Sequence, residues 1–341
     1  MSEEKNITEN KPKTRLILSG MRPTGKLHIG HYVGALENWV ELQKSYQNYY
    51  LIADYHTLTT SLDTSNIYND SIDMVIDWIA CGVDPVKSPI FRQSQIKEHT
   101  ELHLIFSMMI TKARLEKNPT LKDQIRDLKM ESVSYGLLGY PVLQAADILL
   151  YKGNSVPVGE DQVPHVEVTR HIAERFNASF ELNGKKIFPI AEAMITQFPR
   201  LPGLDGKAKM SKSLGNGILL SDNNEEIRAK MKKAFTDPAK LRKGDPGNPD
   251  ICLVYTYHKK FNPEEEPEIR NGCQSGTLGC FDCKMKCADK IAEHFAPSRE
   301  KRAELENNLG RVIEILEDGE ARGRLVAQQT MSEVREAMKF G

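Results

Sequence analysis

Short apolar runs alternate with longer amphipathic stretches along the first two thirds of the chain. Residues 15–18, 49–53 and 90–91 are mostly aliphatic or aromatic, which is typical of buried strands. Between these runs, residues 29–40 and 71–80 place apolar side chains three or four positions apart, the spacing of an amphipathic helix. This strand–helix–strand order predicts a parallel sheet with helices on both faces.

The alternation then gives way to a mainly helical segment. Helical patterns cover 98–117 and 121–138, and strands are expected to resume near Val156 and Ile187. We therefore interpret residues 98–138 as a helical insertion within an α/β domain.

Two domains and a tail follow from these patterns. Residues 14–220 are expected to form the α/β domain, and residues 221–341 a helical domain interrupted by a loop at 243–250 and by a cysteine-rich region. Residues 1–13 are rich in charged and amide side chains and lack the apolar stretch of a signal peptide, so we expect a disordered tail on a cytoplasmic protein. No apolar run reaches the roughly 18 residues that cross a membrane, so we expect no membrane partner.

Charge adds one constraint on partners. The formal net charge is −1, so no strong basic field attracts nucleic acid to the molecule as a whole. Residues 228–243 contain seven basic side chains and one acidic side chain, which suggests a local contact with RNA. A solvated helix face explains the same charges equally well.

A turn rich in glycine and proline joins the first predicted strand to the first helix. His28 and His31 lie three positions apart at the start of that helix, so they share one face of its first turn. A helix start after a parallel strand offers free N–H groups to a phosphate, and two imidazoles add further donors. Gly30 has no Cβ, which leaves room for a flat base or ribose. The alternative is a pair of surface histidines beside a tight turn.

A second candidate phosphate site lies about 180 residues further on. It consists of two lysines, two hydroxyls and a methionine, namely Lys209, Met210, Ser211, Lys212 and Ser213. Glycines on both sides predict a mobile loop that closes its charges over the β and γ phosphates of a nucleotide. A solvated loop of lysine and serine is the alternative.

One carboxylate stands inside an apolar helical pattern. Asp147 follows Gln144 within the otherwise apolar run 140–151, and burial of a carboxylate is costly unless something donates to it. An indole N–H is one suitable donor, since it is the single polar group of a tryptophan side chain. A neighbouring basic side chain or backbone amides would serve equally well.

Five of the six cysteines cluster in the last third of the chain, and the sixth, Cys81, is expected to pack in the core. Four of them are separated by 20, 6 and 2 residues, namely Cys252, Cys273, Cys280 and Cys283. In a cytosolic chain such a group favours metal over disulfides. Zinc sites usually combine two C-x-x-C pairs and this chain has one, whereas iron–sulfur clusters tolerate uneven spacing. Zinc or free thiols remain alternatives, and Cys287 is interpreted as a spare.

These motifs together resemble a known family. Residues 28–31 are similar to the HIGH signature of class I aminoacyl-tRNA synthetases, and residues 209–213 match its KMSKS loop. Residues 146–149, followed by 159–162, resemble the tryptophanyl-tRNA synthetases in particular. Gln144 stands where several bacterial members place an apolar side chain. Some members with similar cysteine spacing carry a 4Fe-4S cluster in the half of the chain that binds tRNA.

The resemblance implies roles for individual residues. The catalytic residues would be His28, His31, Lys209 and Lys212, and tryptophan would lie against Asp147 and Gln144. The cluster would be held by Cys252, Cys273, Cys280 and Cys283. ATP would be bound by residues from four segments, namely Arg22, Pro23, Thr24, Gly30, His31, Gly159, Glu160, Asp161, Gln162, Leu201, Lys209, Met210, Ser211, Lys212 and Ser213.

The resemblance also implies an activity and partners. It implies a Rossmann-type catalytic domain and a helical tRNA-binding domain that join L-tryptophan to tRNA(Trp) with ATP and Mg²⁺. It further implies a homodimer formed through the helices at 98–138. Two rival interpretations are a tyrosine-specific enzyme of the same fold and a catalytically idle relative that binds RNA or senses redox state.

Overall fold

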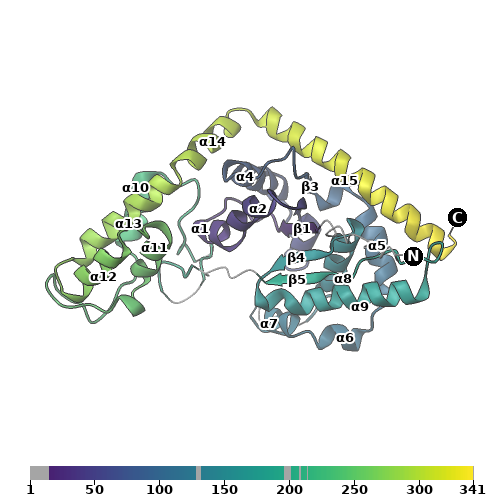
Figure 1. Cartoon of the computed structure of the whole chain (residues 1–341), viewed down its shortest axis with the longest axis horizontal. Coiled ribbons are helices and arrows are strands. Elements are labelled where there is room, and N and C mark those ends of the chain that lie inside the picture. The colour runs from purple at the N-terminus through teal and green to yellow at the C-terminus, as the bar shows by residue number, and fades with distance from the viewer. Residues whose placement is uncertain (1–14, 128–131, 196–200, 207–208, 213, 341) are drawn as a thin grey trace, which may run out of the picture.

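A five-stranded parallel sheet forms the centre of the molecule in the computed structural model, which describes residues 15–127, 132–195, 201–206, 209–212 and 214–340. The strands run in the order β3-β2-β1-β4-β5 (Figure 1). Their bounds are β1 (Leu16–Met21), β2 (Gln47–Ile52), β3 (Ile90–Arg92), β4 (Ser155–Val158) and β5 (Glu192–Ile195). The predicted fold class, a parallel sheet of Rossmann type with helices around it, is confirmed.

Alternate residues of the sheet enter two separate cores. In β2, Tyr50 and Ile52 belong to one buried cluster, whereas Tyr49 and Leu51 belong to the other. Successive strand side chains point to opposite faces, so a strand that is apolar at every position must be covered on both sides. This is why the predicted strands were continuous apolar runs instead of alternating ones.

Helices cover each face of the sheet. The first core contains α4 (Ile67–Ala80) and a continuous helical segment made of α1 (Ile29–His31), the π-helical turn η1 (Tyr32–Leu36) and α2 (Glu37–Leu42). The second core contains α5 (Glu98–Ser107), α8 (Tyr135–Leu150) and α9 (Val163–Ser179). Short elements fill the connections: α3 (Asp54–Thr57), α6 (Lys112–Glu116), α7 (Pro119–Asp127), and the 3-10 turns η2 (Gln93–Gln95) and η3 (Glu160–Gln162).

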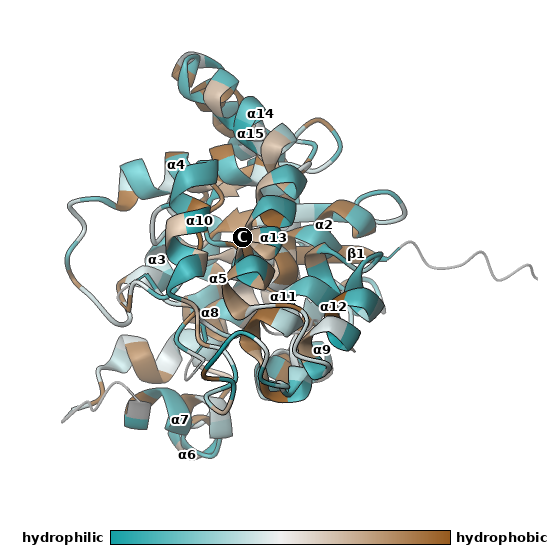
Figure 2. Cartoon of the chain, turned by 90° about the vertical axis from the view of Figure 1, so that its left-hand side faces the viewer, coloured by the Kyte–Doolittle hydropathy of each residue, from teal (hydrophilic) through white to brown (hydrophobic). Residues whose placement is uncertain are grey.

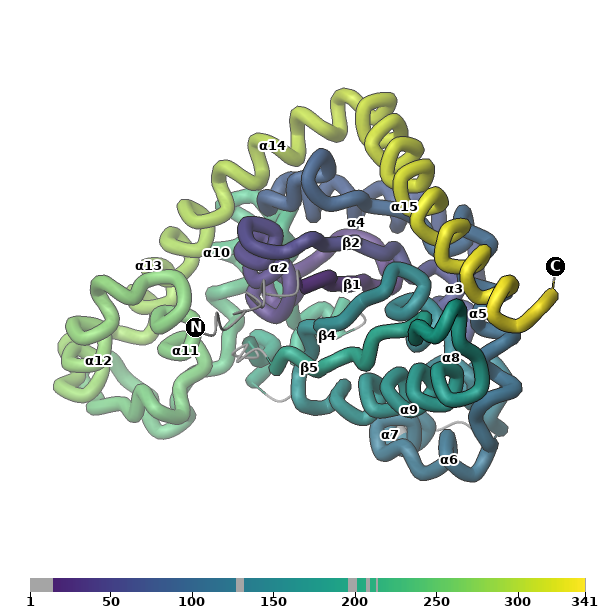
Figure 3. The backbone as a smooth tube through the Cα atoms, turned by 45° about the vertical axis from the view of Figure 1, so that its right-hand side comes forward, coloured from purple at the N-terminus to yellow at the C-terminus, as the bar shows by residue number. Residues whose placement is uncertain are grey.

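The remaining helices form a lobe beside the sheet and then return to it. The lobe comprises α10 (Asn224–Lys232), the 3-10 turn η4 (Pro249–Ile251), α11 (Leu253–Phe261), α12 (Glu266–Gln274) and α13 (Cys280–His294). Helix α14 (Ala296–Glu306) leads out of the lobe, and α15 (Leu309–Met338) runs back along the sheet side of the molecule (Figure 3). Hydrophilic residues lie along the outer sides of α4, α10 and α13 (Figure 2).

Helix α15 packs directly on the edge strand. A Cβ at Gly319 would lie 2.0 Å from the carbonyl oxygen of Ile90 in β3, so only glycine allows the two backbones to approach this closely. Gly323 lies against Phe91 and Ile96 in the same way. The segment predicted as a separate helical domain therefore contains a helix that belongs to the packing of the sheet.

One detail of the predicted element order is wrong. No strand forms at Ile187, because the side chain of Asn177 accepts hydrogen bonds from the backbone N–H groups of Ile187 and Phe188, both at 3.1 Å, and donates to the Phe188 carbonyl at 2.7 Å. The strand begins instead at Glu192. The helices are interrupted in the cysteine-rich region as expected, at residues 275–279 between Cys273 and Cys280, and Cys280 and Cys283 lie in the first turn of α13.

The predicted tail at 1–13 lies outside the described residues. Within the described part of the chain, no helix combines the length and apolar character needed to span a membrane.

Candidate active site

A cleft of about 1100 Å³ opens at the carboxyl ends of the central strands. The residues that line it follow three neighbouring strands: Arg22 follows β1, His56 and Thr60 follow β2, and residues 159–162 follow β4. Helices α7 and α8 complete the lining with Thr120, Asp123, Gln124, Tyr140, Gln144 and Asp147. Open parallel sheets bind ligands at this edge, so the cleft is the first candidate for a substrate site.

Asp147 is buried beside the cleft with three protein donors. It receives hydrogen bonds from His56 Nε2 at 2.9 Å, Gln93 Nε2 at 2.7 Å and His99 Nδ1 at 2.7 Å. Burial opposes ionisation, but the hydrogen bonds and charges of His56 and His99 outweigh it and hold the pKa of Asp147 well below its ordinary value. The carboxylate is therefore ionised and preorganised.

Sequence reasoning did not find these three donors. It left open whether a basic neighbour or a ligand would satisfy Asp147, and the structure supplies neighbours from η2, α3 and α5. His99 is itself held by the hydroxyl of Tyr151 at 3.0 Å. The available signal was a set of polar residues directly after the second and third strands, where side chains of a parallel sheet converge.

The two histidines of the first candidate phosphate site stack on each other. The ring centroids of His28 and His31 are 3.7 Å apart, and His31 Nδ1 accepts from the backbone N–H of His28 at 3.2 Å. Burial, aided by the charge of Lys212, lowers the pKa of His28 to about 4. Burial, aided by the charges of His28 and then Lys212, lowers the pKa of His31 to about 3. Both imidazoles are consequently neutral at pH 7, and each offers one N–H donor.

The space beside Gly30 is occupied by the protein. A Cβ at Gly30 would lie 2.9 Å from His28 Nδ1 and 3.3 Å from the sulfur of Met210. Glycine is thus needed at this position for the packing of His28 and Met210, in addition to any room that it leaves for a nucleotide.

Asn216, a residue that sequence reasoning missed, holds the backbone of the second candidate phosphate site through hydrogen bonds. Asn216 Oδ1 accepts from the backbone N–H of Ser211 at 2.8 Å, and Asn216 Nδ2 donates to the Lys209 carbonyl at 3.3 Å. Lys212 donates through Nζ to the carbonyl of Thr24. Ser213 lies outside the described residues.

The two phosphate segments are joined by backbone hydrogen bonds. The N–H of Ile29 donates to the Ile218 carbonyl at 2.9 Å, and the N–H of Leu220 donates to the Leu27 carbonyl at 2.9 Å. These bonds explain why residues 180 positions apart in the chain act on one region of space.

The segment that contains Leu27 and His28 is also held in place by a buried ion pair. The N–H of Leu27 donates to Asp77 Oδ2 at 2.7 Å, and Arg302 from α14 donates to the other oxygen of Asp77. Burial raises the pKa of Asp77 to about 6, although the charge of Arg302 opposes this rise. Arg302 also contacts Asp73 at 2.6 Å.

Eight of the fifteen predicted ATP residues line one of two pockets, and six others line neither, namely Pro23, Thr24, Gly30, His31, Leu201 and Met210. Arg22, residues 159–162 and Lys209 line the main cleft. A second pocket of about 380 Å³ is lined by His28, Ser211 and Lys212, together with Lys26, Gly215, Gly217, Leu219 and Lys230. Leu201 is buried in the first core and lines neither pocket.

The four predicted metal-binding cysteines converge in the lobe from three helices. Cys252 precedes α11, Cys273 lies in α12, and Cys280 and Cys283 begin α13. Burial, followed by the charges of the other three thiols, raises the pKa of Cys283 to about 12. Among the described residues, however, no group of three or more His, Cys, Asp or Glu side chains is arranged to hold a metal ion.

Comparison with known proteins agrees with this geometry. The family described as tRNA synthetases class I (W and Y) matches residues 10–296. A tryptophan–tRNA ligase from Thermotoga maritima is 47% identical, and one from Aquifex aeolicus is 41% identical; each alignment covers 95% of this chain and 99% of the relative. The chain belongs to the tryptophanyl-tRNA synthetases of class I. The resemblance inferred from the motifs is confirmed.

A solved structure of the same family agrees in fold. The tryptophanyl-tRNA synthetase of Campylobacter jejuni, complexed with ADP and tryptophan, is 33% identical and superposes with a TM-score of 0.85 over 95% of this chain and 99% of its own. Nearly the whole length of this synthetase chain is therefore shared with its relatives.

Proposed function

We propose that the protein is a tryptophan–tRNA ligase that activates L-tryptophan with ATP and transfers it to tRNA(Trp). The main support is a single cleft at the carboxyl ends of the strands, which combines the ionised Asp147 with Lys209 and with residues 159–162. A polar group for an amino-acid side chain and a cation for a nucleotide thus face the same space.

The chemistry requires positioning and charge stabilisation more than a protein nucleophile. A carboxylate oxygen of tryptophan attacks the α-phosphorus of ATP, and the bond from that phosphorus to the bridging oxygen breaks as pyrophosphate leaves. A ribose hydroxyl of the tRNA then attacks the carbonyl carbon of the adenylate, and AMP leaves. Most of the rate enhancement in such a reaction comes from holding the reactants in line and from placing charges that stabilise the transferred phosphate.

The catalytic residues proposed for this step are His28, His31, Lys209 and Lys212. The neutral imidazoles supply N–H donors without a fixed charge, whereas the lysines neutralise the departing pyrophosphate. Lys212 must leave the Thr24 carbonyl to do so. Mg²⁺ supplies further charge neutralisation on the phosphates. The other residues proposed for ATP are Pro23, Thr24, Gly30, Gly159, Glu160, Asp161, Gln162, Leu201, Met210, Ser211 and Ser213.

Asp147 and Gln144 are the residues proposed for the tryptophan side chain. A carboxylate offers about four acceptor positions, and the protein uses three of those of Asp147. The indole N–H takes the fourth. Gln144 lies one turn earlier on α8 and lines the same cleft.

Exchange of labelled pyrophosphate into ATP, measured with each of the twenty amino acids, tests the proposal. We expect exchange with tryptophan alone. Exchange with tyrosine in preference to tryptophan would make the protein a tyrosine enzyme, and no exchange with any amino acid would favour the idle relative.

The four cysteines are proposed to hold a 4Fe-4S cluster. A single zinc ion would require four sulfurs at about 2.3 Å from one point, whereas a four-iron cluster is held by thiolates spread over a wider cage. Buried His258 supports the site: Asn262 Nδ2 donates to its Nδ1 at 3.2 Å, so Nε2 carries the proton and points to the Cys283 carbonyl at 3.1 Å and to the Cys283 sulfur at 3.4 Å. Such an outer hydrogen bond stabilises a thiolate ligand.

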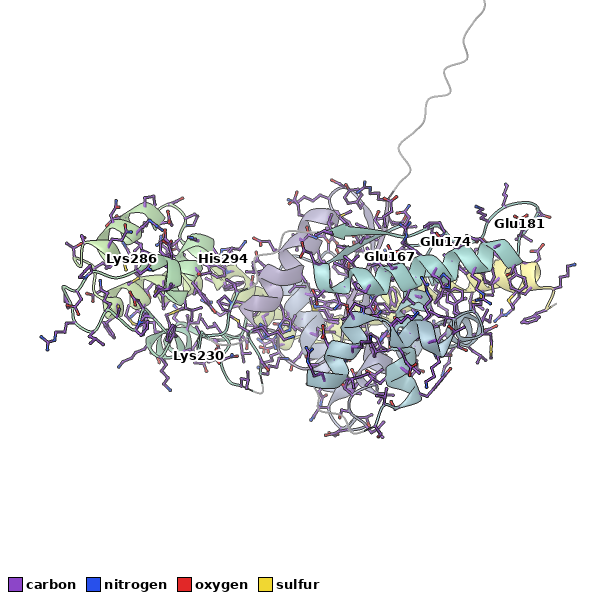
Figure 4. All side chains as sticks on the ribbon, turned by 90° about the horizontal axis from the view of Figure 1, so that it is seen from below. Glu167, Glu174, Glu181, Lys230, Lys286 and His294 are labelled. Atoms are coloured by element: carbon purple, nitrogen blue, oxygen red, sulfur yellow. The ribbon has the colours of Figure 1, made fainter. Side chains whose placement is uncertain are left out.

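The lobe, as part of a tRNA-binding domain at 221–341, is proposed to contact tRNA. Much of the basic stretch 228–243 is already engaged, since Arg228 pairs with Asp289 and Lys240 donates to the Cys273 carbonyl. Lys232 remains exposed beside the exposed ring of Phe281, a combination that suits an unstacked base. By contrast, α9 and the residues after it carry a row of acidic side chains, which would repel a polyanion (Figure 4): Glu167, Glu174 and Glu181.

A homodimer through the insertion is proposed from exposed apolar side chains. Leu104 on α5 and Met108 directly after it are 58% and 74% exposed, and Val133 before α8 and Tyr135 at its start are 42% and 71% exposed. An apolar group of this size marks a protein interface. Light scattering should give twice the mass of one chain. We place the activity in the cytoplasm, where aminoacylated tRNA is used.

A further inference from the structure

Arg22 enters the main cleft as an unpaired cation. It follows β1, the middle strand of the sheet, and so lies between the residues that follow β2 and those that follow β4. Its Nη1 donates a hydrogen bond to the neutral hydroxyl of Thr60, at 3.2 Å. Among the described residues no carboxylate forms an ion pair with it. A guanidinium is charged at every physiological pH, and the exposed Arg22 is open to solvent in the cleft, so an anionic ligand that enters the cleft can pair with it.

The amino-acid end of the cleft lies next to this cation. Arg22 lines the same cleft as Tyr140, Gln144 and Asp147. Tyr140, Gln144 and Asp147 lie at positions i, i+4 and i+7 of α8 and therefore share one helix face. Arg22 thus faces the same side of α8 as the carboxylate proposed for the indole.

The phosphates of ATP have other cations available. Lys209 lines the cleft and Lys212 lines the adjoining pocket, together with Lys26 and Lys230. The bound amino acid has one anionic group, its α-carboxylate, and among the described residues that line the main cleft the lysine and arginine side chains are Lys209 and Arg22. Arginine also matches a carboxylate with two parallel N–H donors, which a lysine cannot do.

We infer that Arg22 binds the α-carboxylate of the amino-acid substrate and turns one of its oxygens toward the α-phosphorus. The inference rests on the proposed function and deepens it, since the sequence places Arg22 among the ATP residues. The free oxygen donates its electron pair to phosphorus, the bond to pyrophosphate breaks, and no proton moves. Arg22 holds the second oxygen throughout, and it loses its ion pair when the carboxylate becomes the carbonyl of the adenylate. Thr60 positions the guanidinium.

The test compares two ligands that differ in the carboxylate. L-tryptophan and tryptamine are titrated against wild-type protein, Arg22→Gln and Arg22→Lys by calorimetry. Wild-type protein should bind tryptophan more tightly than tryptamine by roughly 10- to 100-fold, the range of one charge-assisted pair. Arg22→Gln should reduce this ratio to near one while it leaves tryptamine affinity unchanged, and Arg22→Lys should retain part of it. Lys44→Gln, a change at an exposed side chain that pairs only with Glu41, is the matched control.

Kinetics separate the two substrates. In Arg22→Gln the KM for tryptophan in pyrophosphate exchange should rise by the same factor, and the KM for ATP should change by less than about twofold. An unchanged ratio of tryptophan to tryptamine affinity, or a rise in KM for ATP alone, would show that Arg22 serves the nucleotide and overturn the inference. Loss of tryptamine affinity as well would also overturn it. Failure of the wild-type protein to bind tryptophan would instead remove the proposed function.

Discussion

At the scale of single residues, Asp147 has a structural role in addition to the recognition role proposed for it. It is 2% exposed and receives three donors from separate segments. A buried carboxylate with this many donors is costly to alter, because each donor is left without an acceptor. The same donors keep it ionised and fixed in place for a ligand.

We predict that Asp147→Asn lowers kcat/KM for tryptophan by about 100-fold, which corresponds to roughly 3 kcal/mol of lost hydrogen bonding to a charged group. The KM for ATP should stay within about twofold of the wild-type value. Pyrophosphate exchange measures both. Asp318→Asn is the control, since the Asp318 side chain is 64% exposed on α15. An Asp147→Asn protein with unchanged kcat/KM would show that Asp147 is purely structural.

His28 and His31 predict a pH dependence of stability. Their pKa values are about 4 and 3 in the folded protein, against about 6.5 in an unfolded chain. Below pH 6.5 the unfolded chain binds more protons, so the free energy of unfolding falls as the pH falls through this window toward 3. The double variant His28→Asn, His31→Asn should lose less stability than wild type between pH 7 and 4. Melting temperatures of the two proteins, measured across this pH range, test the prediction. If the melting temperatures of wild type and variant fell in parallel with pH, the assigned pKa values would be contradicted.

At the scale of elements, the conformation of the loop that carries Lys209 and Lys212 depends on the side chain of Asn216. Asn216 holds the backbone at Ser211 and Lys209, and its own carbonyl accepts from the N–H of Leu204 at 2.7 Å. A loop held at both ends can move as a unit when it closes over phosphates.

We predict that Asn216→Ala lowers kcat for adenylate formation by roughly tenfold, since a small displacement of catalytic groups is costly in rate. Affinity for tryptophan should not change, because Asn216 lies away from Asp147. Single-turnover formation of the adenylate gives the rate, and calorimetry gives the affinity. Asn308→Ala, which removes a cap at the start of α15, serves as the control. If Asn216→Ala lowered the affinity for tryptophan and left the rate of adenylate formation unchanged, this role of Asn216 would be contradicted.

At the scale of the whole molecule, the final helices tie the lobe to the catalytic segment. Arg302 on α14 is 3% exposed and reaches Asp77, which in turn holds Leu27 beside His28. On the lobe side, Phe295 at the end of α13 packs edge-on against Tyr32, with ring centroids 5.0 Å apart. The two halves of the chain therefore share one core.

Breaking the buried pair should destabilise the whole protein. We predict that Arg302→Met lowers the free energy of unfolding by about 3 to 5 kcal/mol, because it leaves Asp77 buried without its cation. Arg311→Met removes an exposed pair with Glu314, where both side chains are more than half exposed, and should cost no more than about 1 kcal/mol. Denaturant unfolding compares the two variants; equal losses would mean that the Arg302 pair adds nothing beyond a surface contact.

A change at the cysteine site should impair the transfer of tryptophan to tRNA much more than the formation of the adenylate. We predict that Cys283→Ser abolishes the brown colour and iron content of anaerobically purified protein and lowers tRNA charging by roughly tenfold or more, about 1.4 kcal/mol of lost interaction. Pyrophosphate exchange should largely survive, since the cysteines lie in the lobe and the cleft lies at the sheet. Cys81→Ser, outside the cluster, is the control. A colourless wild-type protein with one zinc per chain would refute the iron–sulfur proposal, and equal loss of exchange and charging would refute the division.

The sequence by itself determined the elements and the phosphate motifs. Apolar runs and helical periodicity are carried by residues near one another in the chain, so they revealed the parallel sheet and most helices. The segments around His28 and Lys209 could be recognised for the same reason. The strand expected at Ile187 does not form, because the side chain of Asn177 hydrogen-bonds to the backbone groups of Ile187 and Phe188. Asn177 lies outside the local pattern that predicted the strand.

Only the tertiary structure decided how Asp147 is satisfied and how the halves are joined. His56 lies 91 positions from Asp147, and Arg302 lies 225 positions from Asp77. Contacts of this range depend on which helix faces meet across the sheet, and neither period nor spacing along the chain contains that information. The return of α15 onto β3 through Gly319 depends on it as well.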